Sequence, residues 1–375
     1  MANSAPSSSA PSSSLLINLS FAIAQPTGLS NYALSILPHL QRLNPALLTP
    51  QDHPGFSCYR TPDNMTSAHG AKGHLRRLLW TQFTLPRWYR RLRSDLLFCP
   101  IPEAPLGFPL FPKCRTVVMA HDVIPLRVAP PRSRLRQYFR YYVPRVLKQA
   151  CHVVCNSQAT ADDLIHFYGI PAGKITPIPL ACDTQRYRPL NLERQPFFVY
   201  LGRNDPYKNL SRAIAAFAQF LYQVPNPNDW EFRLAGPIDD RYHPALLMQI
   251  RSLGLGEHIK FLGYVPDDEL PILLNQATAL VFPSLWEGFG LPVLEALSCG
   301  TPCIVSRRAS LPEVAGDAAL WVDPLQVRSI RKAMVQLVKE PGVMAQFQER
   351  AIAQAANFSW EKTGNATAEV LERFL

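Results

Sequence analysis

The ten residues WEGFGLPVLE, from Trp286 to Glu295, decide how this chain of 375 residues folds. They follow the apolar run Ala279–Phe282 and lead into an amphipathic run, so the order is strand, glycine loop and helix. A glycine loop that opens a helix presents unpaired backbone N–H groups at the positive end of the helix dipole, which suits a phosphate. Glu287 and Glu295 would repel a phosphate, so we expect these carboxylates to accept hydrogen bonds from hydroxyls of a sugar or a ribose.

Short apolar runs and amphipathic runs alternate along the whole chain. The runs expected to be strands lie at residues 15–23, 95–99, 115–120, 151–155, 197–201, 231–235, 259–263, 279–282 and 302–306. The runs expected to be helices lie at residues 31–43, 134–150, 210–221, 267–276 and 293–297. This alternation predicts parallel sheets with right-handed crossovers, whose ligands bind beyond the carboxyl ends of the strands.

The length of the chain predicts two domains of ordinary size. We place the first at residues 15–188 and the second at 196–358, with a linker at 187–193. Residues 1–14 are almost all Ser, Ala and Pro, and they read as a disordered tail. No apolar run approaches the ~20 residues that a membrane-spanning helix needs.

The first apolar run and the cysteines bear on the cellular compartment. A signal peptide is one interpretation of residues 15–24, because Ala22-Ile23-Ala24 fits a small-residue cleavage site. No Lys or Arg precedes this run, so we favour a buried first strand. The eight cysteines form no Cys-x-x-Cys pair, and we expect buried, reduced thiols and a cytoplasmic protein.

The net charge of +10 is concentrated in the first half of the chain. Residues 72–148 hold sixteen Lys or Arg and three acidic residues, whereas residues 196–358 hold fourteen basic and sixteen acidic residues. A basic half indicates an anionic partner, either lipid headgroups or a phosphorylated acceptor; no nucleic-acid-binding signature accompanies it, so we expect no nucleic acid. The stretch 74–93 fits docking on an anionic membrane surface or, equally, a helix with its arginines in water, and Pro86 argues against one long helix.

Three residues behind expected strand ends are candidates for binding a diphosphate. Gly28 follows the first strand and lets the backbone approach a ligand closely. Arg203 and Lys208 follow the strand at 197–201, near a helix start whose dipole is already positive, and an anion between them would remove this conflict. The three-glycine dinucleotide fingerprint is absent, which argues against a nicotinamide dehydrogenase. A structural turn at Gly28 and a solvated loop at the two cations are the alternatives.

His121 and Asp122 follow the expected strand at 115–120. At a strand end the histidine could hydrogen-bond a ligand, and the pair could act as a proton-relay base. A histidine satisfied in a structural turn is the alternative. No two aspartates lie two positions apart, so a metal-chelating Asp-x-Asp pair is missing, and we expect cations rather than a metal to neutralise a leaving group.

The chain resembles the retaining glycosyltransferases of family 4, which have the GT-B fold. The resemblance covers nearly the whole chain after residue 15, and its motifs are Thr27-Gly28, His121-Asp122, Asn156–Thr160, Gly202-Arg203, Lys208-Asn209, Phe261–Val265, the glutamate stretch, Leu311–Val314 and Gly316–Ala319. It implies an α/β fold of two facing, Rossmann-like, doubly wound domains with an interdomain cleft. It also implies a C-terminal helix, at 360–375, that crosses back to the first domain.

The resemblance implies a role for each candidate residue. Arg203 and Lys208 would hold the diphosphate of a nucleotide-sugar donor, Glu287 the sugar hydroxyls and Glu295 the ribose, while backbone near Tyr264 would read the base. The full set expected to bind the donor is Gly28, Tyr264, Val265, Phe289, Gly290, Leu291 and Glu295. The set expected to act in the reaction is His121, Glu287, Arg203 and Lys208, with Asp122 on the acceptor side.

The sequence as a whole predicts a glycosyltransferase that moves a hexose and retains the anomeric configuration without a metal or another cofactor. GDP-mannose or UDP-glucose is the expected donor, and a glycan or glycolipid is the expected acceptor. We expect a cytoplasmic protein that works at the inner face of the membrane. A catalytically silent nucleotide-sugar-binding protein and an NAD-dependent oxidoreductase are the alternatives.

Overall fold

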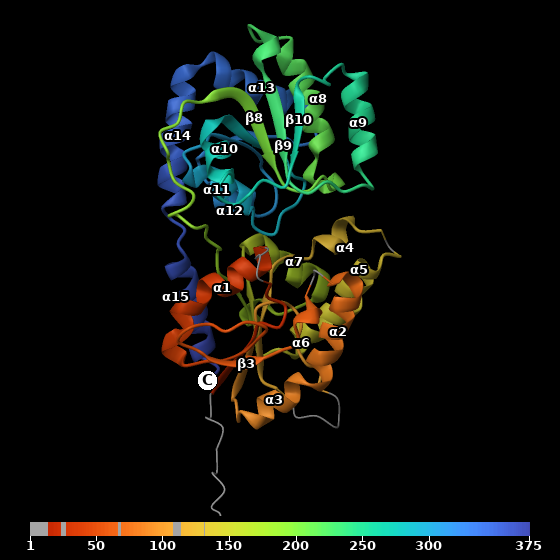
Figure 1. Ribbon diagram of the computed structural model, residues 1–375, viewed down its shortest axis with the longest axis vertical. Coiled ribbons are helices and arrows are strands. Elements are labelled where there is room, and N and C mark those ends of the chain that lie inside the picture. Colours follow the sequence, from red (N-terminus) through yellow and green to blue (C-terminus); the bar gives the residue numbers. More distant parts are fainter. Residues whose placement is uncertain (1–13, 24–27, 67–68, 108–113, 131) are drawn as a thin grey trace, which may run out of the picture. The chain divides into compact units, whose positions relative to one another are not determined.

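The computed structural model describes residues 14–23, 28–66, 69–107, 114–130 and 132–375 (Figure 1). The expected tail, except Ser14, and Thr27 of the first glycine loop therefore lie outside the described residues. Backbone contacts divide the chain into two units. Unit 1 runs from the N-terminus to Asn156 and includes Thr160–Ile178 and Glu361–Leu375; unit 2 comprises Ser157–Ala159 and Pro179–Trp360.

Unit 1 contains a seven-stranded sheet in the order β3-β2-β1-β4-β5-β6-β7, in which all neighbouring strands are parallel. Its strands are β1 (Leu15–Asn18), β2 (Ala46–Thr49), β3 (Ser57–Arg60), β4 (Leu96–Cys99), β5 (Thr116–Ala120), β6 (His152–Cys155) and β7 (Ile175–Pro177). Its helices are α1 (Gly28–Leu40), α2 (Gly70–Phe83), α3 (Leu85–Arg91), α4 (Ile124–Val128), α5 (Arg134–Gln137), α6 (Val143–Gln149), α7 (Gln158–Tyr168) and α15 (Trp360–Glu372). A π-helical turn at Tyr138–Tyr142 joins α5 to α6.

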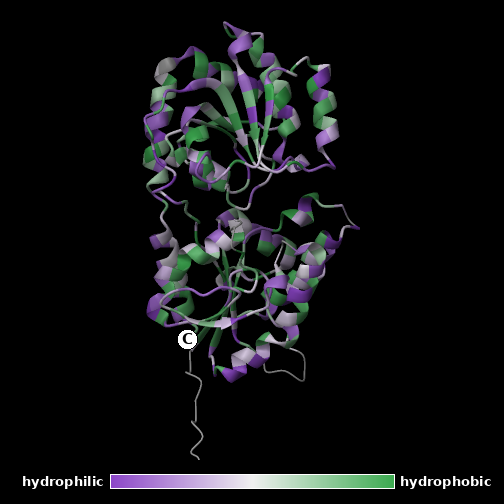
Figure 2. Ribbon diagram, viewed as in Figure 1, coloured by the Kyte–Doolittle hydropathy of each residue, from purple (hydrophilic) through white to green (hydrophobic). Residues whose placement is uncertain are grey.

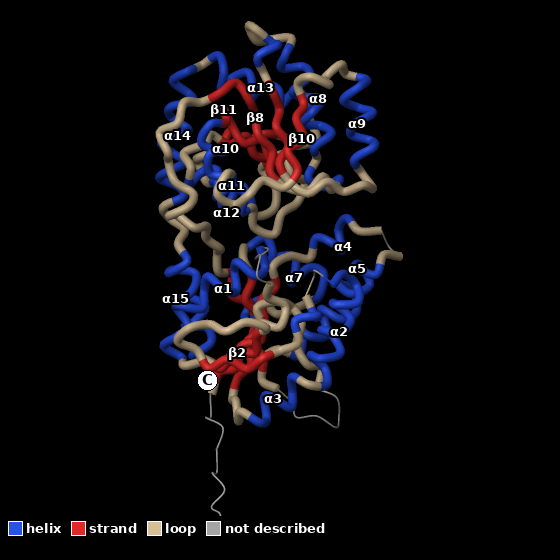
Figure 3. The backbone as a smooth tube through the Cα atoms, viewed as in Figure 1, coloured by secondary structure: helices blue, strands red, loops and turns tan. Residues whose placement is uncertain are grey.

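Unit 2 contains a six-stranded parallel sheet in the order β10-β9-β8-β11-β12-β13. Its strands are β8 (Gln195–Leu201), β9 (Glu231–Ala235), β10 (Ile259–Gly263), β11 (Ala277–Phe282), β12 (Cys303–Ser306) and β13 (Ala319–Val322). Its helices are α8 (Leu210–Leu221), α9 (His243–Ser252), α10 (Leu270–Gln276), α11 (Leu291–Ser298), α12 (Leu311–Ala315), α13 (Val327–Lys339) and α14 (Pro341–Ala355). In each unit, helices flank a central sheet (Figure 3).

Both sheets have the strand order of doubly wound nucleotide-binding folds, as the alternating pattern predicts. The order reverses between β1 and β4 in unit 1 and between β8 and β11 in unit 2, and ligands of such folds bind at this switch point. Residues of the inner strands are mostly buried and apolar (Figure 2), because helices cover both faces of each sheet, whereas the edge strand β3 is partly exposed. In unit 2 the rings of Phe198, Phe217, Phe220 and Trp230 pack together with centroids 5.0–6.3 Å apart.

Several elements differ from the sequence-based expectation for physical reasons. β1 ends at Asn18 rather than at residue 23, because the Asn18 side chain accepts the Ser20 amide and Ala22 bonds back to Leu19. The helix expected at 31–43 begins at Gly28 and ends in a 3₁₀ turn. The break expected at Pro86 is confirmed, since α2 ends at Phe83 and α3 begins at Leu85.

The segment assigned by sequence to the end of the first domain clusters with unit 2 from Pro179 onward. One residue of α10 holds it there: the Asn275 side chain accepts the Leu190 amide at 2.8 Å and donates to the Arg188 carbonyl at 3.0 Å. The expected linker is therefore fixed on unit 2. Among the described residues, no helix is long and apolar enough to cross a membrane.

The last helix, α15, belongs to unit 1 from Glu361 onward. Glu372 forms an ion pair with Arg42 at 3.2 Å, and Phe374 packs on the His152 ring. Gly364 faces α1 so closely that an added Cβ would lie 2.5 Å from the Cβ of His39.

We predict that Gly364→Ala lowers the free energy of unfolding by about 1–3 kcal/mol, because the new methyl group has no room against His39. Gly342→Ala in α14 is the matched control, since its Cβ would meet no atom within 4 Å, and it should be neutral or stabilising by about 0.5–1 kcal/mol. Urea denaturation of both variants measures the effect. Equal stability of the two variants would contradict the close packing of α15 on α1.

Candidate active site

Lys208 and Glu287 form a buried ion pair at the switch point of unit 2. Lys208 ends the 3₁₀ turn behind β8, and Glu287 lies in the loop behind β11. The lysine Nζ donates to Glu287 Oε1 at 2.8 Å and to Oε2 at 2.9 Å, and the two side chains are only 13% and 8% exposed. The Nζ also lies 5.3 Å from the ring centroids of Tyr207 and Phe282. Two residues that the sequence marks separately are thus brought together.

The turn that carries Lys208 is fastened to the loops behind neighbouring strands. The Leu285 amide donates to the Tyr207 carbonyl at 2.7 Å. The Asn209 side chain donates to the carbonyls of Pro283 and Pro324 at 3.0 and 2.7 Å. The lysine is therefore positioned before any ligand arrives.

The glycine loop before α11 is held in a shape that requires glycine. Gly290 has φ = 110°, and a Cβ there would lie 2.7 Å from a Leu311 methyl group. Ser310 donates to the carbonyls of Glu287 and Phe289 at 3.0 and 2.7 Å. Because these carbonyls are bound from behind, the loop can present its amides to a ligand at the start of α11.

Phe289 and Leu291, the other loop residues expected to bind the donor, are placed differently. The Phe289 ring is buried, with its centroid 6.0 Å from that of Phe358, so only its backbone is available to a ligand. Leu291 is the first residue of α11, and the amides of a first helical turn have no partner within the helix.

Glu295 lies one turn into α11 in a partly buried position. Burial and, to a smaller extent, the negative charge of Asp267 raise the pKa of this carboxyl to about 7, although a hydrogen bond with Tyr187 partly opposes them. Tyr187 lies in the segment that the sequence presents as a linker. The carboxyl is therefore poised to change its charge near neutral pH.

Arg203 is bound by carboxylates rather than left with an unpaired charge. Its guanidinium contacts Asp205 at 3.3 Å and Asp239 at 2.8 Å, and the side chain is 55% exposed. Arg241 also binds Asp239, and both arginines lower the pKa of its carboxyl below the usual range. The conflict expected between two cations at a helix start is absent, because Arg203 and Lys208 each have an acidic partner.

Tyr264 and Val265, expected near the base of a nucleotide, follow β10. The Tyr264 side chain is 71% exposed, and its hydroxyl donates to Asp267 at 3.4 Å. Asp267 also binds Arg186 at 3.0 Å. The Tyr264 ring is therefore exposed to solvent, and its hydroxyl lies beside Asp267, whose negative charge raises the pKa of Glu295.

In unit 1, His121 and Asp122 lie between β5 and α4 and use their side chains separately. His121 Nε2 donates to the Pro100 carbonyl at 2.9 Å, and burial lowers the pKa of the imidazole to about 4. The neutral ring therefore keeps Nδ1 as a hydrogen-bond acceptor. Asp122 accepts the Ile124 amide at 2.9 Å, which caps the start of α4.

Gly28, the remaining candidate of unit 1, is the exposed first residue of α1. An added Cβ would meet no described atom within 4 Å. Packing of the described residues therefore does not require glycine at this position. Tyr32, one turn later in α1, packs edge-on against the His121 ring at 5.1 Å.

Four residues that the motifs did not mark also contribute to the site: Tyr187, Asp239, Ser310 and Pro100. Each contacts a candidate residue that lies more than twenty positions away in the sequence. Ser310 directly precedes the Leu311–Val314 motif, which is the one signal that could have found it. In the described part of the chain, no group of three or more His, Cys, Asp or Glu side chains is arranged to hold a metal ion.

The parallel sheets, their strand order and the glutamate loop define a GT-B glycosyltransferase. The chain belongs to the group 1 glycosyltransferases: residues 183–356 match the model "Glycosyl transferases group 1", and residues 26–186 match "Glycosyltransferase Family 4". It is therefore a transferase enzyme.

Among curated proteins, the chain is 32% identical to the O-antigen chain mannosyltransferase B of Escherichia coli, over 69% of this chain and 70% of that protein. It is 29% identical to the serotype-specific mannosyltransferase WbdA of Escherichia coli, over 70% of this chain but only 34% of that longer protein.

Among solved structures, sucrose-phosphate synthase of Thermosynechococcus elongatus matches with a TM-score of 0.76 at 18% identity, over 96% of this chain and 98% of that one. HepE of Anabaena, solved in complex with UDP and glucose, matches with a TM-score of 0.74 at 19% identity, over 96% and 99%. These structures establish the fold.

We predict that Glu295→Gln makes the protein more stable than the wild type at alkaline but not at acidic pH. A carboxyl whose pKa is raised in the folded state destabilises the fold once it ionises, so the wild type loses stability between pH 4.5 and about 7. The variant should gain about 1–3 kcal/mol at pH 8 and nothing at pH 4.5. Glu349→Gln, at an exposed position of α14, is the control. A pH-independent difference between Glu295→Gln and the wild type in urea denaturation would contradict the burial of this charge.

Proposed function

We propose that this glycosyltransferase moves a hexose from a nucleotide-diphosphate sugar to a glycan or glycolipid acceptor, with retention of the anomeric configuration and without a metal ion. The observation that carries the proposal is the Lys208–Glu287 pair at the switch point of unit 2. A cation for a diphosphate and a carboxylate for sugar hydroxyls lie side by side there. This is the arrangement that a donor with both groups requires.

The cation of the pair would stabilise the leaving group. An ammonium has three N–H donors, and in Lys208 two of them are accounted for by the oxygens of Glu287. The third can reach a phosphate oxygen, whose charge grows as the bond to the sugar breaks. Arg203 would assist by exchanging part of its contact with Asp205 and Asp239 for the diphosphate. Fixed cations would thus take the place of a metal.

The transfer itself would proceed on one face of the sugar. The bond between the anomeric carbon and the phosphate oxygen breaks, the acceptor oxygen bonds to the same face, and the acceptor proton passes to the leaving phosphate. Glu287 would hold the sugar hydroxyls rather than attack the anomeric carbon, because its two oxygens already bind the ammonium. His121, neutral above pH 5, would accept a hydrogen bond from a sugar hydroxyl at Nδ1.

The relatives support mannose as the transferred sugar. The Escherichia coli proteins are named mannosyltransferases, which supports GDP-mannose over UDP-glucose as the donor, and the HepE complex with UDP and glucose supports the nucleotide-sugar class. By the same likeness the acceptor would be a growing cell-surface polysaccharide. Among the alternatives, a silent sugar-nucleotide binder would retain the same binding residues, so turnover decides between the two.

A cytoplasmic protein at the membrane face is part of the proposal. The exposed side of α2 carries the apolar residues Leu75, Leu79 and Phe83, which are 57%, 51% and 42% exposed. Lys72 and Arg76 are exposed on the same helix. Exposed apolar residues among cations suit an anionic membrane surface.

We predict that Lys208→Gln lowers kcat for hexose transfer by roughly 10²–10³-fold, because the leaving diphosphate loses its fixed cation. Lys332→Gln, at an exposed position of α13, should keep the wild-type rate. Since Lys208→Gln strands a buried carboxylate, Lys208→Gln/Glu287→Gln removes both charges and separates loss of catalysis from loss of folding. Wild-type kcat in folded Lys208→Gln with GDP-mannose or UDP-glucose would overturn the role of this residue.

We further predict that donor affinity falls as the pH falls through 7. Glu295 must be ionised to accept ribose hydroxyls with both oxygens, and its pKa of about 7 leaves it largely protonated at pH 5.5. Affinity for GDP-mannose should then be about tenfold lower at pH 5.5 than at pH 8. Calorimetry in buffers of different ionisation heat should detect proton uptake or release on binding. Glu295→Gln should bind weakly at both pH values, and a pH-independent affinity of the wild type would contradict the ribose assignment.

A further inference from the structure

Unit 1 contains a cavity of about 330 Å³ that is lined by three cations and four largely apolar side chains. The cations are Arg136, Arg140 and Lys148, on the continuous helical segment from α5 through the π-helical turn to α6. The remaining lining residues are Leu126, Pro144, Phe167 and Tyr168. A cavity of this volume is within the range of small-ligand sites.

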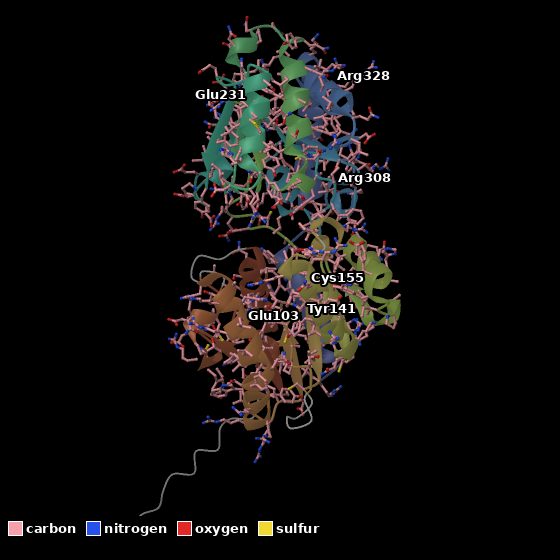
Figure 4. The ribbon with its side chains drawn as sticks, turned by 90° about the vertical axis from the view of Figure 1, so that its right-hand side faces the viewer. Glu103, Tyr141, Cys155, Glu231, Arg308 and Arg328 are labelled. Carbon is pink, nitrogen blue, oxygen red and sulfur yellow. The ribbon has the colours of Figure 1, made fainter. Side chains whose placement is uncertain are left out.

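The cations of this cavity have no acidic partner among the described residues, in contrast to other basic residues of unit 1. Arg77 binds the buried Glu103, whose position is labelled in Figure 4, at 2.7 Å, and Arg127 binds Asp163 at 2.5 Å. No lining residue of the cavity is acidic. Like charges spaced four residues apart on a helix repel each other, so an anion in the cavity would relieve the repulsion.

Parts of the lining are held in place before a ligand binds. The Arg136 Nη1 donates to the Ala129 carbonyl at 2.7 Å, which leaves other guanidinium N–H groups for an anion. The Tyr168 hydroxyl donates to the Phe139 carbonyl in the π-helical turn at 2.5 Å. Guanidinium groups match the geometry of phosphate oxygens and bind them in pairs.

The cavity is adjacent in the chain to the candidate residues of unit 1. Leu126 of its lining belongs to α4, the helix that Asp122 caps and that begins three residues after His121. The side chain of Asp122 is also close enough to raise the pKa of Tyr168. The same short segment thus carries the histidine and one side of the cavity.

We propose that this cavity binds a phosphate or diphosphate group of the acceptor. The identity of the ligand as an acceptor depends on the proposed function, whereas binding of the anion does not. The apolar lining residues would pack against the part of the acceptor next to the phosphate, and the phosphate would fix the acceptor in unit 1. The phosphate could belong to a soluble phosphorylated glycan or to a lipid headgroup, and the experiment separates these sources.

The test measures pyrophosphate binding by calorimetry to the full chain carrying Arg203→Gln together with Lys208→Gln/Glu287→Gln, so that the donor's diphosphate site does not contribute and no buried carboxylate is left unpaired. Adding Arg140→Gln and Lys148→Gln should weaken this binding by about tenfold or more, because two charged contacts are lost. Arg134→Gln, an exposed position of α5 outside the cavity, should change it less than twofold. Pyrophosphate binding that is absent, or unaffected by the cavity substitutions, overturns the proposal even if the enzyme transfers hexose.

A second arm identifies the source of the phosphate with flotation of vesicles of phosphatidylcholine, with and without phosphatidylglycerol. Every variant in this arm also carries Leu75→Gln and Leu79→Gln, so that docking through the exposed side of α2 does not contribute. Binding to the anionic vesicles that Arg140→Gln/Lys148→Gln abolishes, and Arg134→Gln keeps, supports a lipid headgroup in the cavity. No vesicle binding, together with the expected loss of pyrophosphate binding, supports a soluble phosphorylated acceptor. Vesicle binding that the double substitution leaves intact overturns the lipid source.

Discussion

The ion pair of Lys208 and Glu287 is the interaction on which the loops of unit 2 depend. Burying an ammonium or a carboxylate alone costs several kcal/mol, so each side chain stays in place only while the other is present. The pair also ties the turn behind β8 to the loop behind β11, beside the backbone bond from Leu285 to Tyr207. A group that binds here meets both charges in fixed positions, and little reorganisation remains for the moment of reaction.

The strand order determines which loops meet. Because neighbouring strands are parallel, all loops behind their carboxyl ends lie at one edge of the sheet, and the reversal between β8 and β11 opens a gap in the helical cover there. In unit 2 those two strands carry Lys208 and Glu287. In unit 1 the corresponding strands, β1 and β4, lead to Gly28 and to Pro100, whose carbonyl holds His121. Topology therefore gathers residues that lie far apart in the sequence.

Local patterns were enough to predict most of the elements around the site. The loop before α11 could be predicted because Gly288 and Gly290 allow backbone angles that other residues avoid, while Pro292 favours the first turn of a helix. The strands β2, β3, β7 and β13 were missed. β3 and β7 contain no continuous apolar run, and the short apolar runs of β2 and β13 do not differ in period from a buried helical segment. The break at Pro86 was predicted because proline acts on its own helix.

Partners across the fold were not readable, because no local pattern encodes them. Arg203 binds Asp239, 36 positions away, and the sequence suggested that an anionic ligand must balance its charge. Glu295 is hydrogen-bonded to Tyr187, which lies in a segment that the sequence predicts only to be a linker. Its raised pKa follows from burial, which is a property of the folded chain. The chemistry of each residue could be predicted, but its electrostatic setting could not.

The basic character of the first half illustrates the same division between composition and structure. Sixteen basic residues within 72–148 indicate an anionic partner, but they do not say where it binds. In the folded chain these basic residues have different surroundings. Arg77 and Arg127 bind buried carboxylates, whereas Arg76 is exposed to solvent. Arg140 lines a cavity together with other cations. A structural cation is matched by an acid, whereas a cation kept for a ligand is not. Arg136, Arg140 and Lys148 have no acidic partner among the described residues, and their cavity adjoins the segment that carries His121. The proposed phosphate site therefore rests on where acidic residues are absent as well as on where basic residues lie.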